Sequence, residues 1–196
     1  MSNQQSPPTS LTPATLDGKS VVLVGLMGAG KTCIGKRLAL KLGMEFVDAD
    51  AEIEAAADRT VSEIFIELGE QAFRDGERRV IARLLSEKPR VIATGGGAFM
   101  DADTRANTRR QGVSVWLKAD LEVLLHRVSR RNNRPLLQGG NKRRKLENLM
   151  TQRYPTYSEA DVTVNTGEES PDSTVQKVYD ALSKFSPVTN TSATTE

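Results

Sequence analysis

Residues 21–32, VVLVGLMGAGKT, join an apolar run to a glycine-rich loop and the start of a helix. The apolar residues Val21 to Val24 predict a buried strand, which Gly25 closes. From Gly25 to Thr32 the sequence fits the pattern G-x-x-x-x-G-K-[ST] at every required position. Such a loop wraps its backbone N–H groups around a phosphate, and the helix N-terminus adds a favourable dipole. A glycine turn followed by an exposed lysine is the alternative, but the flanking strand and helix favour a nucleotide site.

The loop supplies a set of candidate nucleotide-binding residues. Lys31 is expected to reach the β- and γ-phosphates, and the hydroxyl of Thr32 is expected to coordinate Mg²⁺. Cys33 is interpreted as a small residue packed in the helix, not as a reactive thiol. The candidate set is Gly28, Ala29, Gly30, Lys31, Thr32 and Cys33.

Apolar runs that alternate with helical patterns predict an α/β fold along the rest of the chain. The expected strands are 21–24, 44–48, 91–93, 112–117 and 161–166. The expected helices are 31–42, 51–57, 60–86 with a break at Gly69, one from Asp101, one from Asp120, 146–154 stopped by Pro155, and 170–185. Strands separated by helices pair in parallel, so we expect a three-layer fold with a five-stranded parallel sheet and helices on both faces. In such sheets, ligands bind at the carboxyl ends of the strands.

Two acids follow the second expected strand, in FVDAD. If the extended backbone continues through Asp48 and Asp50, both carboxylates lie on one face at the strand tip. One of them would serve the hydration shell of the metal, and the other would accept a hydrogen bond from an acceptor hydroxyl. The alternative is an acidic strand end with a helix cap at Asp50.

Three glycines, Gly95 to Gly97, follow the third expected strand in the stretch VIATGGGAF. No side chain at these positions can provide acid, base or metal chemistry. Taken alone, the run is a flexible turn.

Six motifs, taken in this order, resemble the shikimate kinase family. They are the loop at Gly25, DAD after the second strand, GEQAFR at 69–74, GGG at 95–97, RPLL at Arg134 and QRYPTY at 152–157. The resemblance spans residues 21 to 185. It implies a P-loop kinase fold and transfer of phosphate from ATP, with Mg²⁺, to the 3-hydroxyl of shikimate in aromatic amino-acid biosynthesis.

The resemblance also implies a role for each matching residue. Asp50 matches the carboxylate that binds ring hydroxyls and accepts the proton, and Asp48 matches the acid near Mg²⁺. Gly95, Gly96 and Gly97 match the run that approaches the substrate with backbone groups. The remaining matches are Arg74 and Arg153 for the substrate carboxylate, Arg134 for the lid, Arg127 against adenine, and Phe65, Phe73 and Glu77 around the pocket. The catalytic set implied is Lys31, Asp50 and Arg134.

Composition sets the expected boundaries. Residues 1–18 and 186–196 are rich in polar residues and are expected to be a disordered leader and tail. Residues 19–185 then form one kinase domain, in which 50–86 are the substrate-binding helices. The basic segment 129–145, which has a proline and two glycines, is expected to be a mobile lid.

Bulk properties limit the other function classes. The 196 residues carry a net charge of +2, too small to argue for nucleic acid, and the single cysteine excludes an internal disulfide framework or a cysteine zinc site. No apolar run approaches membrane-spanning length, and the N-terminus has no secretory signal pattern. We expect a cytoplasmic, monomeric enzyme whose partners are shikimate and ATP, with no nucleic acid and no membrane.

Three other functions remain open at this point. Another small-metabolite kinase, such as a gluconate kinase, would share the loop and the lid but not the combination of GGG with GEQAFR. Nucleic-acid binding through the basic cluster 127–145 and Arg153 would lack interleaved aromatic residues for stacking. A regulator that only binds nucleotide would not need to retain Lys31, Asp50, Arg74 and Arg134.

Overall fold

The structure, a computed structural model, describes residues 16–129 and 141–185. The expected tail, residues 1–15 of the expected leader, and Arg134 with residues 130–140 of the expected lid lie outside the described residues. The described fold includes Leu16, which precedes the expected start at Lys19, because its side chain is buried in the core. Within these residues, no helix is long and apolar enough to cross a membrane.

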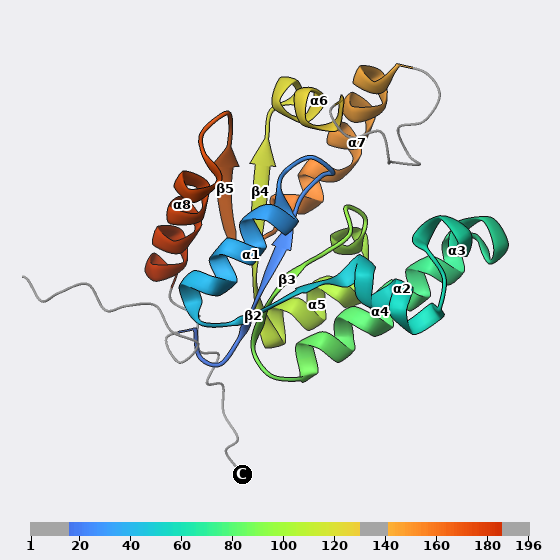
Figure 1. The fold of residues 1–196 in the computed structure, drawn as a ribbon, viewed down its shortest axis with the longest axis horizontal. Helices are drawn as coiled ribbons and strands as arrows, with labels where there is room; N and C mark the ends of the chain where they lie inside the picture. Colours follow the sequence, from blue (N-terminus) through green and yellow to red (C-terminus); the bar gives the residue numbers. More distant parts are fainter. Residues whose placement is uncertain (1–15, 130–140, 186–196) are drawn as a thin grey trace, which may run out of the picture.

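Strands and helices alternate as the sequence predicts (Figure 1). The elements are β1 (Ser20–Val24), α1 (Lys31–Leu42), β2 (Glu45–Asp48), α2 (Ala49–Ala57), α3 (Val61–Glu67), α4 (Gly69–Ser86), β3 (Arg90–Ala93), η1 (Ala98–Met100), α5 (Ala102–Gln111), β4 (Gly112–Ala119), α6 (Leu121–Ser129), α7 (Lys142–Tyr157), β5 (Val162–Thr166) and α8 (Pro171–Lys184).

Five strands of the described chain form one parallel sheet in the order β2-β3-β1-β4-β5. Strand β1 is central, and the chain moves to one side of it through β2 and β3 and to the other side through β4 and β5. The carboxyl ends of β1 and β3 therefore lie next to each other, with the glycine-rich loop after β1 and the three glycines after β3. Such a point, where the strand order reverses, is where open parallel sheets bind ligands.

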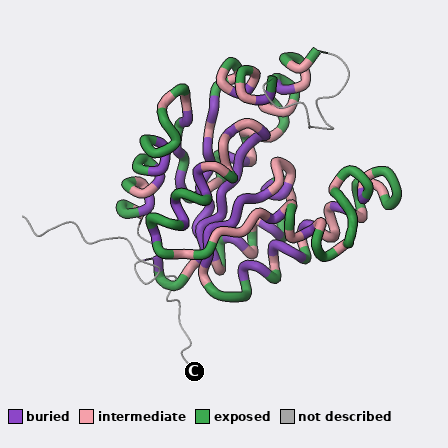
Figure 2. Tube along the Cα trace, viewed as in Figure 1, coloured by how far each residue is buried: buried purple, intermediate pink, exposed green. Residues whose placement is uncertain are grey.

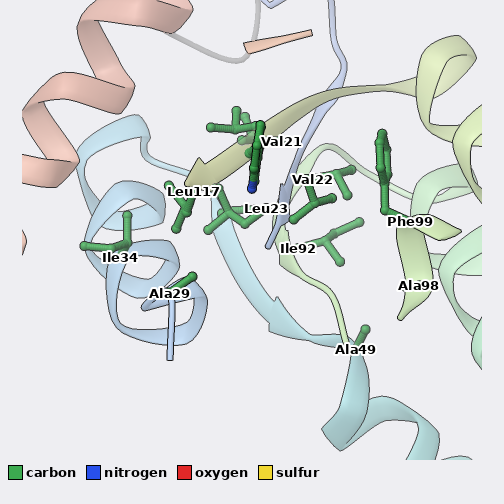
Figure 3. Close-up of a cluster of buried hydrophobic side chains, with 14 of the residues drawn as sticks. Val21, Val22, Leu23, Ala29, Ile34, Ala49, Ile92, Ala98, Phe99 and Leu117 are labelled. Carbon is green, nitrogen blue, oxygen red and sulfur yellow. The ribbon is translucent and has the colours of Figure 1, made fainter. Parts of the chain in front are cut away.

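Successive residues of β1 pack against opposite layers, so the strand is buried along its whole length. Figure 3 shows Val22 and Ile92 on the side of Phe99, and Leu23 on the side of Ile34 and Leu117. Helices α1 and α8 pack together on one face, whereas α4 and α5 pack together on the other. Figure 2 shows the buried residues following the strands and the exposed residues following the outer sides of the helices.

Local signals place several helix ends where the sequence predicts them. Thr60 and Glu63 form the reciprocal capping box of α3. Gly69, with a φ of 83°, begins α4 directly after Leu68, which caps the end of α3. Gly43, with a φ of 64°, ends α1.

The expectation that Pro155 stops its helix is wrong. Helix α7 continues through Pro155 to Tyr157, and the Ser158 N–H donates to the Tyr154 carbonyl at 2.9 Å. A proline removes one intrahelical donor. Buried contacts of Tyr157 in the last turn, described below, hold the helix beyond it.

The segment expected to be a lid, 129–145, is helical at both described ends. Ser129 is the last residue of α6, and residues 142–145 form the first turn of α7. The Asn141 side chain accepts from the Arg144 N–H at 3.2 Å and caps this turn. This cap starts α7 before the expected residue, Leu146.

Candidate active site

The glycine-rich loop between β1 and α1 has the geometry of an anion site. Gly28 and Gly30 have φ angles of 87° and 100°, which favour glycine, and they turn the loop around the start of α1. Among the described residues, no side chain caps the N-terminus of α1, and its first turn has no acid. The first N–H groups of this helix therefore point at the loop with a partial positive charge.

Lys31 lies across the same loop. Its Nζ atom donates to the carbonyl oxygens of Gly25 at 2.7 Å and Leu26 at 3.1 Å. The ammonium group is thus held above the loop, next to the helix N-terminus, where it can bind a phosphate.

Asp48 and Asp50 are not in one extended segment, because α2 begins at Ala49. Asp48 ends β2 and caps α2: its Oδ1 atom accepts from the Asp50 N–H at 3.2 Å. The expectation of two acids on one strand face is therefore wrong, and so is the alternative with Asp50 as the cap. The helical turn sends the two carboxylates to different neighbours.

The Asp48 carboxylate faces the glycine-rich loop. Its Oδ2 atom accepts from the Thr32 hydroxyl at 2.9 Å. This pair offers two oxygen atoms at the start of α1, and oxygen is the ligand type that Mg²⁺ prefers. In the described residues no cluster of three or more acidic, histidine or cysteine side chains could hold a metal. Mg²⁺ is commonly bound through one or two protein oxygens together with phosphate and water, and the Thr32 and Asp48 pair offers such oxygens.

Asp50 lies with Glu77 at Gly95. A Cβ atom built on Gly95 would be 2.9 Å from Asp50 Oδ1 and 2.5 Å from Glu77 Oε1. Burial raises the pKa of the Glu77 carboxyl; the Arg74 guanidinium opposes this and the Asp50 carboxylate adds to it. Two carboxyl groups therefore meet at the glycine run, where a side chain on residue 95 would displace them.

Arg74 lies flat against Gly97. A Cβ atom there would be 2.5 Å from its Nη1, 2.7 Å from its Cζ and 2.7 Å from its Nη2 atom. The guanidinium donates to Glu77 at 2.6 Å and to Glu70 at 3.3 Å, and it lies 5.0 Å from the Phe73 ring centroid. These neighbours orient the guanidinium. The Arg74 side chain is 25% exposed to solvent, so a ligand can still reach it.

Arg153 reaches the glycine run from α7. Its Nη1 atom donates to the Gly96 carbonyl at 2.8 Å. A Cβ atom on Gly96 would be 3.3 Å from this nitrogen, and 3.7 Å and 3.8 Å from Gly25 O and Met27 N in the glycine-rich loop. Gly96 thus lies next to both Arg153 and the glycine-rich loop between β1 and α1, which we call the phosphate loop.

Arg127, on α6, lies at the other side of the phosphate loop. Its Nη1 atom donates to the carbonyls of Gly28 and Ala29 at 3.3 Å each, and its Nη2 atom donates to the Gly167 carbonyl after β5. The side chain therefore ties the loop to the end of β5, and its expected position against adenine remains a prediction.

Other side chains named from the sequence lie around the loop and the glycine run, pack in the core or are exposed. Cys33 is half-buried in α1, and its Sγ atom accepts from Arg37 at 3.0 Å. Phe65 stacks on Phe73 at 4.6 Å between centroids, beside Arg74. Trp116 is buried within β4, and His126 on α6 is exposed.

Tyr157 is the functional candidate that the sequence interpretation missed. Its side chain is fully buried, and its hydroxyl donates to the Gly96 carbonyl, the acceptor that Arg153 also uses. The available signal was its spacing, since Tyr157 follows Arg153 by one helical turn in QRYPTY. The prediction that Pro155 stops the helix placed Tyr157 outside it, so the spacing of Arg153 and Tyr157 on one helix was not recognised.

Comparison with known proteins gives the same family for sequence and structure. The family model for shikimate kinase matches residues 27–183. Shikimate kinase of Caulobacter vibrioides is 58% identical over 169 residues, which are 86% of this chain and 84% of that protein. The Mesorhizobium japonicum shikimate kinase is 46% identical over 197 residues, covering 99% and 97%.

Solved structures agree with these matches. Shikimate kinase from Acinetobacter baumannii in complex with shikimate has a TM-score of 0.80 and 42% identity, covering 84% of this chain and 93% of that one. A gluconokinase from Sinorhizobium meliloti has a TM-score of 0.57 and 18% identity, which shows a shared fold alone. Because the family model covers most of the chain and the similar relatives align over most of their length, this chain belongs to the shikimate kinase family.

Proposed function

We propose that this chain transfers the γ-phosphate of ATP to the 3-hydroxyl of shikimate, with the residues described above in defined roles. The observation that carries these roles is the position of Gly96: its carbonyl accepts from Arg153, and a Cβ atom on it would be 3.7 Å from Gly25 O in the phosphate loop. An acceptor bound at the glycine run is therefore adjacent to a phosphate bound at the loop. Phosphoryl transfer depends on such alignment and on charge neutralisation more than on covalent help.

The donor side binds ATP. Backbone N–H groups of Gly28 to Thr32 would surround the β-phosphate, and Lys31 would exchange its loop carbonyls for β- and γ-phosphate oxygens. Cys33 would contribute its N–H group in the first turn of α1. Arg127 supports the loop through its hydrogen bonds to the Gly28 and Ala29 carbonyls.

Mg²⁺ fits the Thr32 and Asp48 oxygens. Thr32 would coordinate it through the hydroxyl, and Asp48 would hold its hydration water. When bound, the ion neutralises charge on the transferring phosphate. Asp48 also fixes the start of α2, so the same side chain orients the segment that carries Asp50.

The acceptor side binds a planar carboxylate and ring hydroxyls. Arg74 and Arg153 approach the glycine run at adjacent residues, Gly97 and Gly96, so two forked guanidinium groups can share one carboxylate. The absence of side chains from residue 95 to residue 97 lets the Glu77, Arg153 and Arg74 side chains approach the backbone, and the substrate would bind against these groups.

Asp50 would orient the attacking hydroxyl and accept its proton. Its carboxylate lies at Gly95, one end of the same run, while the arginines lie at the other residues. A substrate gripped by its carboxylate therefore presents a ring hydroxyl to Asp50. Arg134, as the lid arginine of the family, would neutralise the transferring phosphate.

All described groups come from one chain, and we propose that a monomer is sufficient. We expect the reaction in the cytoplasm, where ATP is available.

The test is a coupled assay of ADP release with shikimate, with gluconate and with no acceptor. We expect turnover that requires shikimate, and we expect Lys31→Ala to abolish it in a chain that still folds. ADP release with gluconate alone, or at an equal rate without an acceptor, would contradict the assigned acceptor. A nearly normal rate for Lys31→Ala would refute the phosphate assignment.

A further inference from the structure

The Gly96 carbonyl is held by two side chains of α7. The Arg153 Nη1 atom donates to it at 2.8 Å, and the Tyr157 hydroxyl donates to the same oxygen. The two residues are one helical turn apart and share one face of α7. A carbonyl oxygen has two lone pairs, so the pair of donors satisfies both.

The two hydrogen bonds to the Gly96 carbonyl also fix the orientation of the Gly96–Gly97 peptide. The Gly96 carbonyl and the Gly97 N–H belong to one planar peptide unit and point in opposite directions. Fixing the oxygen on the α7 side therefore turns the Gly97 N–H away from α7. A glycine run has little conformational preference of its own, so the orientation of this peptide depends on what its oxygen accepts.

Tyr157 is suited to hold such an orientation. Its side chain is fully buried, and its ring packs against Trp116 at 5.9 Å between centroids. Burial raises the pKa of the Tyr157 phenol, while the nearby Arg153 guanidinium opposes this. The hydroxyl therefore keeps its proton at neutral pH and remains a donor.

Tyr157 also limits Arg153. The guanidinium has five N–H donors in a rigid fork, and one of them is used at Gly96. With the second lone pair of the carbonyl occupied by Tyr157, the guanidinium cannot turn further onto that oxygen. The remaining N–H donors of the guanidinium are therefore not used at Gly96.

We propose that Tyr157 is a positioning residue for the phosphoryl acceptor: its hydroxyl orients the Gly96–Gly97 peptide and the Arg153 guanidinium for binding the substrate carboxylate and ring. This inference rests on the proposed function, because the acceptor is shikimate. It assigns a role to a side chain that is expected to act through its neighbours and not by touching the substrate.

Tyr154 provides a matched control on the same helix. It packs on the same tryptophan at 4.9 Å, and its hydroxyl also donates to a backbone carbonyl, that of Ala119 at 2.5 Å. Burial raises its pKa to about 12. The two tyrosines hold different carbonyls, since Ala119 ends β4 whereas Gly96 lies in the glycine run. They also differ in burial, because Tyr157 is fully buried and Tyr154 is half-buried.

The experiment compares Tyr157→Phe with Tyr154→Phe by steady-state kinetics and thermal unfolding. We expect Tyr157→Phe to raise the KM for shikimate about fivefold, the effect of losing one hydrogen bond, with the KM for ATP unchanged. We expect Tyr154→Phe to leave both KM values unchanged. The shift in Tm produced by saturating shikimate, a readout independent of turnover, should fall in Tyr157→Phe alone.

Three results would overturn the proposal. The first is an unchanged KM for shikimate in Tyr157→Phe, and the second is an equal rise in both variants, since either would make the hydroxyl structural only. The third is a Tyr157→Phe chain that fails to fold while Tyr154→Phe folds, because the hydroxyl would then determine folding. A wild-type chain without shikimate-dependent ADP release would instead refute the proposed function itself, and this inference with it.

Discussion

Replacing Gly97 by alanine tests whether the glycine run exists to let Arg74 lie against the backbone. The new Cβ would stand 2.5 Å from Nη1 and 2.7 Å from Cζ of Arg74, closer than real contacts allow. The backbone itself tolerates alanine, because the φ and ψ angles of Gly97 are −100° and −17°. The strain therefore falls on the guanidinium, which lies at the end of a flexible side chain.

The magnitude follows from this displacement. The guanidinium must withdraw by about 1 Å to reach an ordinary contact distance. Such a shift breaks the geometry of a charge-assisted hydrogen bond, which contributes about 1.5–3 kcal/mol. Because 1.4 kcal/mol corresponds to a factor of ten, we expect the KM for shikimate to rise roughly 10- to 100-fold. The KM for ATP should change little, since the phosphate loop is not touched, whereas the Tm should fall, because the same shift weakens the hydrogen bond from Arg74 to the buried Glu77 carboxyl.

The assay is coupled ADP release with each substrate varied in turn, together with thermal unfolding. Gly76→Ala is the matched control, because Gly76 lies in α4, two residues after Arg74, and a Cβ atom there would meet nothing within 4 Å. We expect this control to raise stability by about 0.5–1 kcal/mol and to leave both KM values unchanged.

A double-mutant cycle separates displacement of Arg74 from a direct clash of the new methyl with substrate. If the effect passes through Arg74, Gly97→Ala adds little to an Arg74→Ala chain. If the two effects multiply, the methyl blocks the substrate itself and the reasoning about Arg74 is wrong. An unchanged KM in the single variant would also refute it.

Four further predictions concern the same site. Arg74→Lys should raise the KM for shikimate about tenfold by losing the forked geometry, with the KM for ATP constant; a parallel rise in both would show that the carboxylate clamp is misplaced. Asp50→Asn should lower kcat by roughly 100-fold or more in single-turnover measurements, whereas a pure KM effect would limit Asp50 to binding. Asp48→Asn should raise the Mg²⁺ concentration needed for half-maximal turnover, because the Thr32 and Asp48 pair loses its charge, and an unchanged Mg²⁺ titration would argue against this assignment. Burial raises the pKa of the Glu77 carboxyl above 4.5 in the folded chain. The stability that the protonated carboxyl contributes is therefore present below the pKa of the unfolded chain and is lost as the pH rises through the pKa of the folded chain. In urea unfolding from pH 4 to 7, Glu77→Gln should lose less stability with rising pH than the wild type, and parallel curves of stability against pH would contradict this.

Elements with strong local signals could be predicted from sequence. The bounds of α1 follow from the phosphate-loop lysine and the left-handed Gly43, and the start of α3 follows from the Thr60 capping box. The parallel sheet follows from strands alternating with helices, because each strand needs cover on both faces. The apolar run predicts that β4 ends at Leu117, but the strand continues to Ala119, because Lys118 interrupts the apolar pattern without ending the pairing with β5.

Features that depend on contacts between distant segments could not be derived from local pattern. Pro155 predicts a helix end locally, and only the burial of Tyr157 and its contact with Gly96 explain why α7 continues. Asp48 and Asp50 have a strand-like spacing, but capping by Asp48 starts a helix between them. The prediction that Arg74 and Arg153 meet at one site rests on the resemblance of the motifs to a known family. No periodicity in the sequence relates α4 to α7, so the local pattern could not predict this contact.

The central claim is that Arg74 on α4, Arg153 on α7 and Asp50 on α2 bind one shikimate molecule at the glycine run. The most direct measurement is a crystal structure of the chain with shikimate, ADP and Mg²⁺. We expect the shikimate carboxylate within hydrogen-bond distance of both guanidinium groups, and the 3-hydroxyl at Asp50 facing the phosphate loop. Shikimate bound elsewhere, or bound with its carboxylate turned away from the two arginines, would contradict this claim.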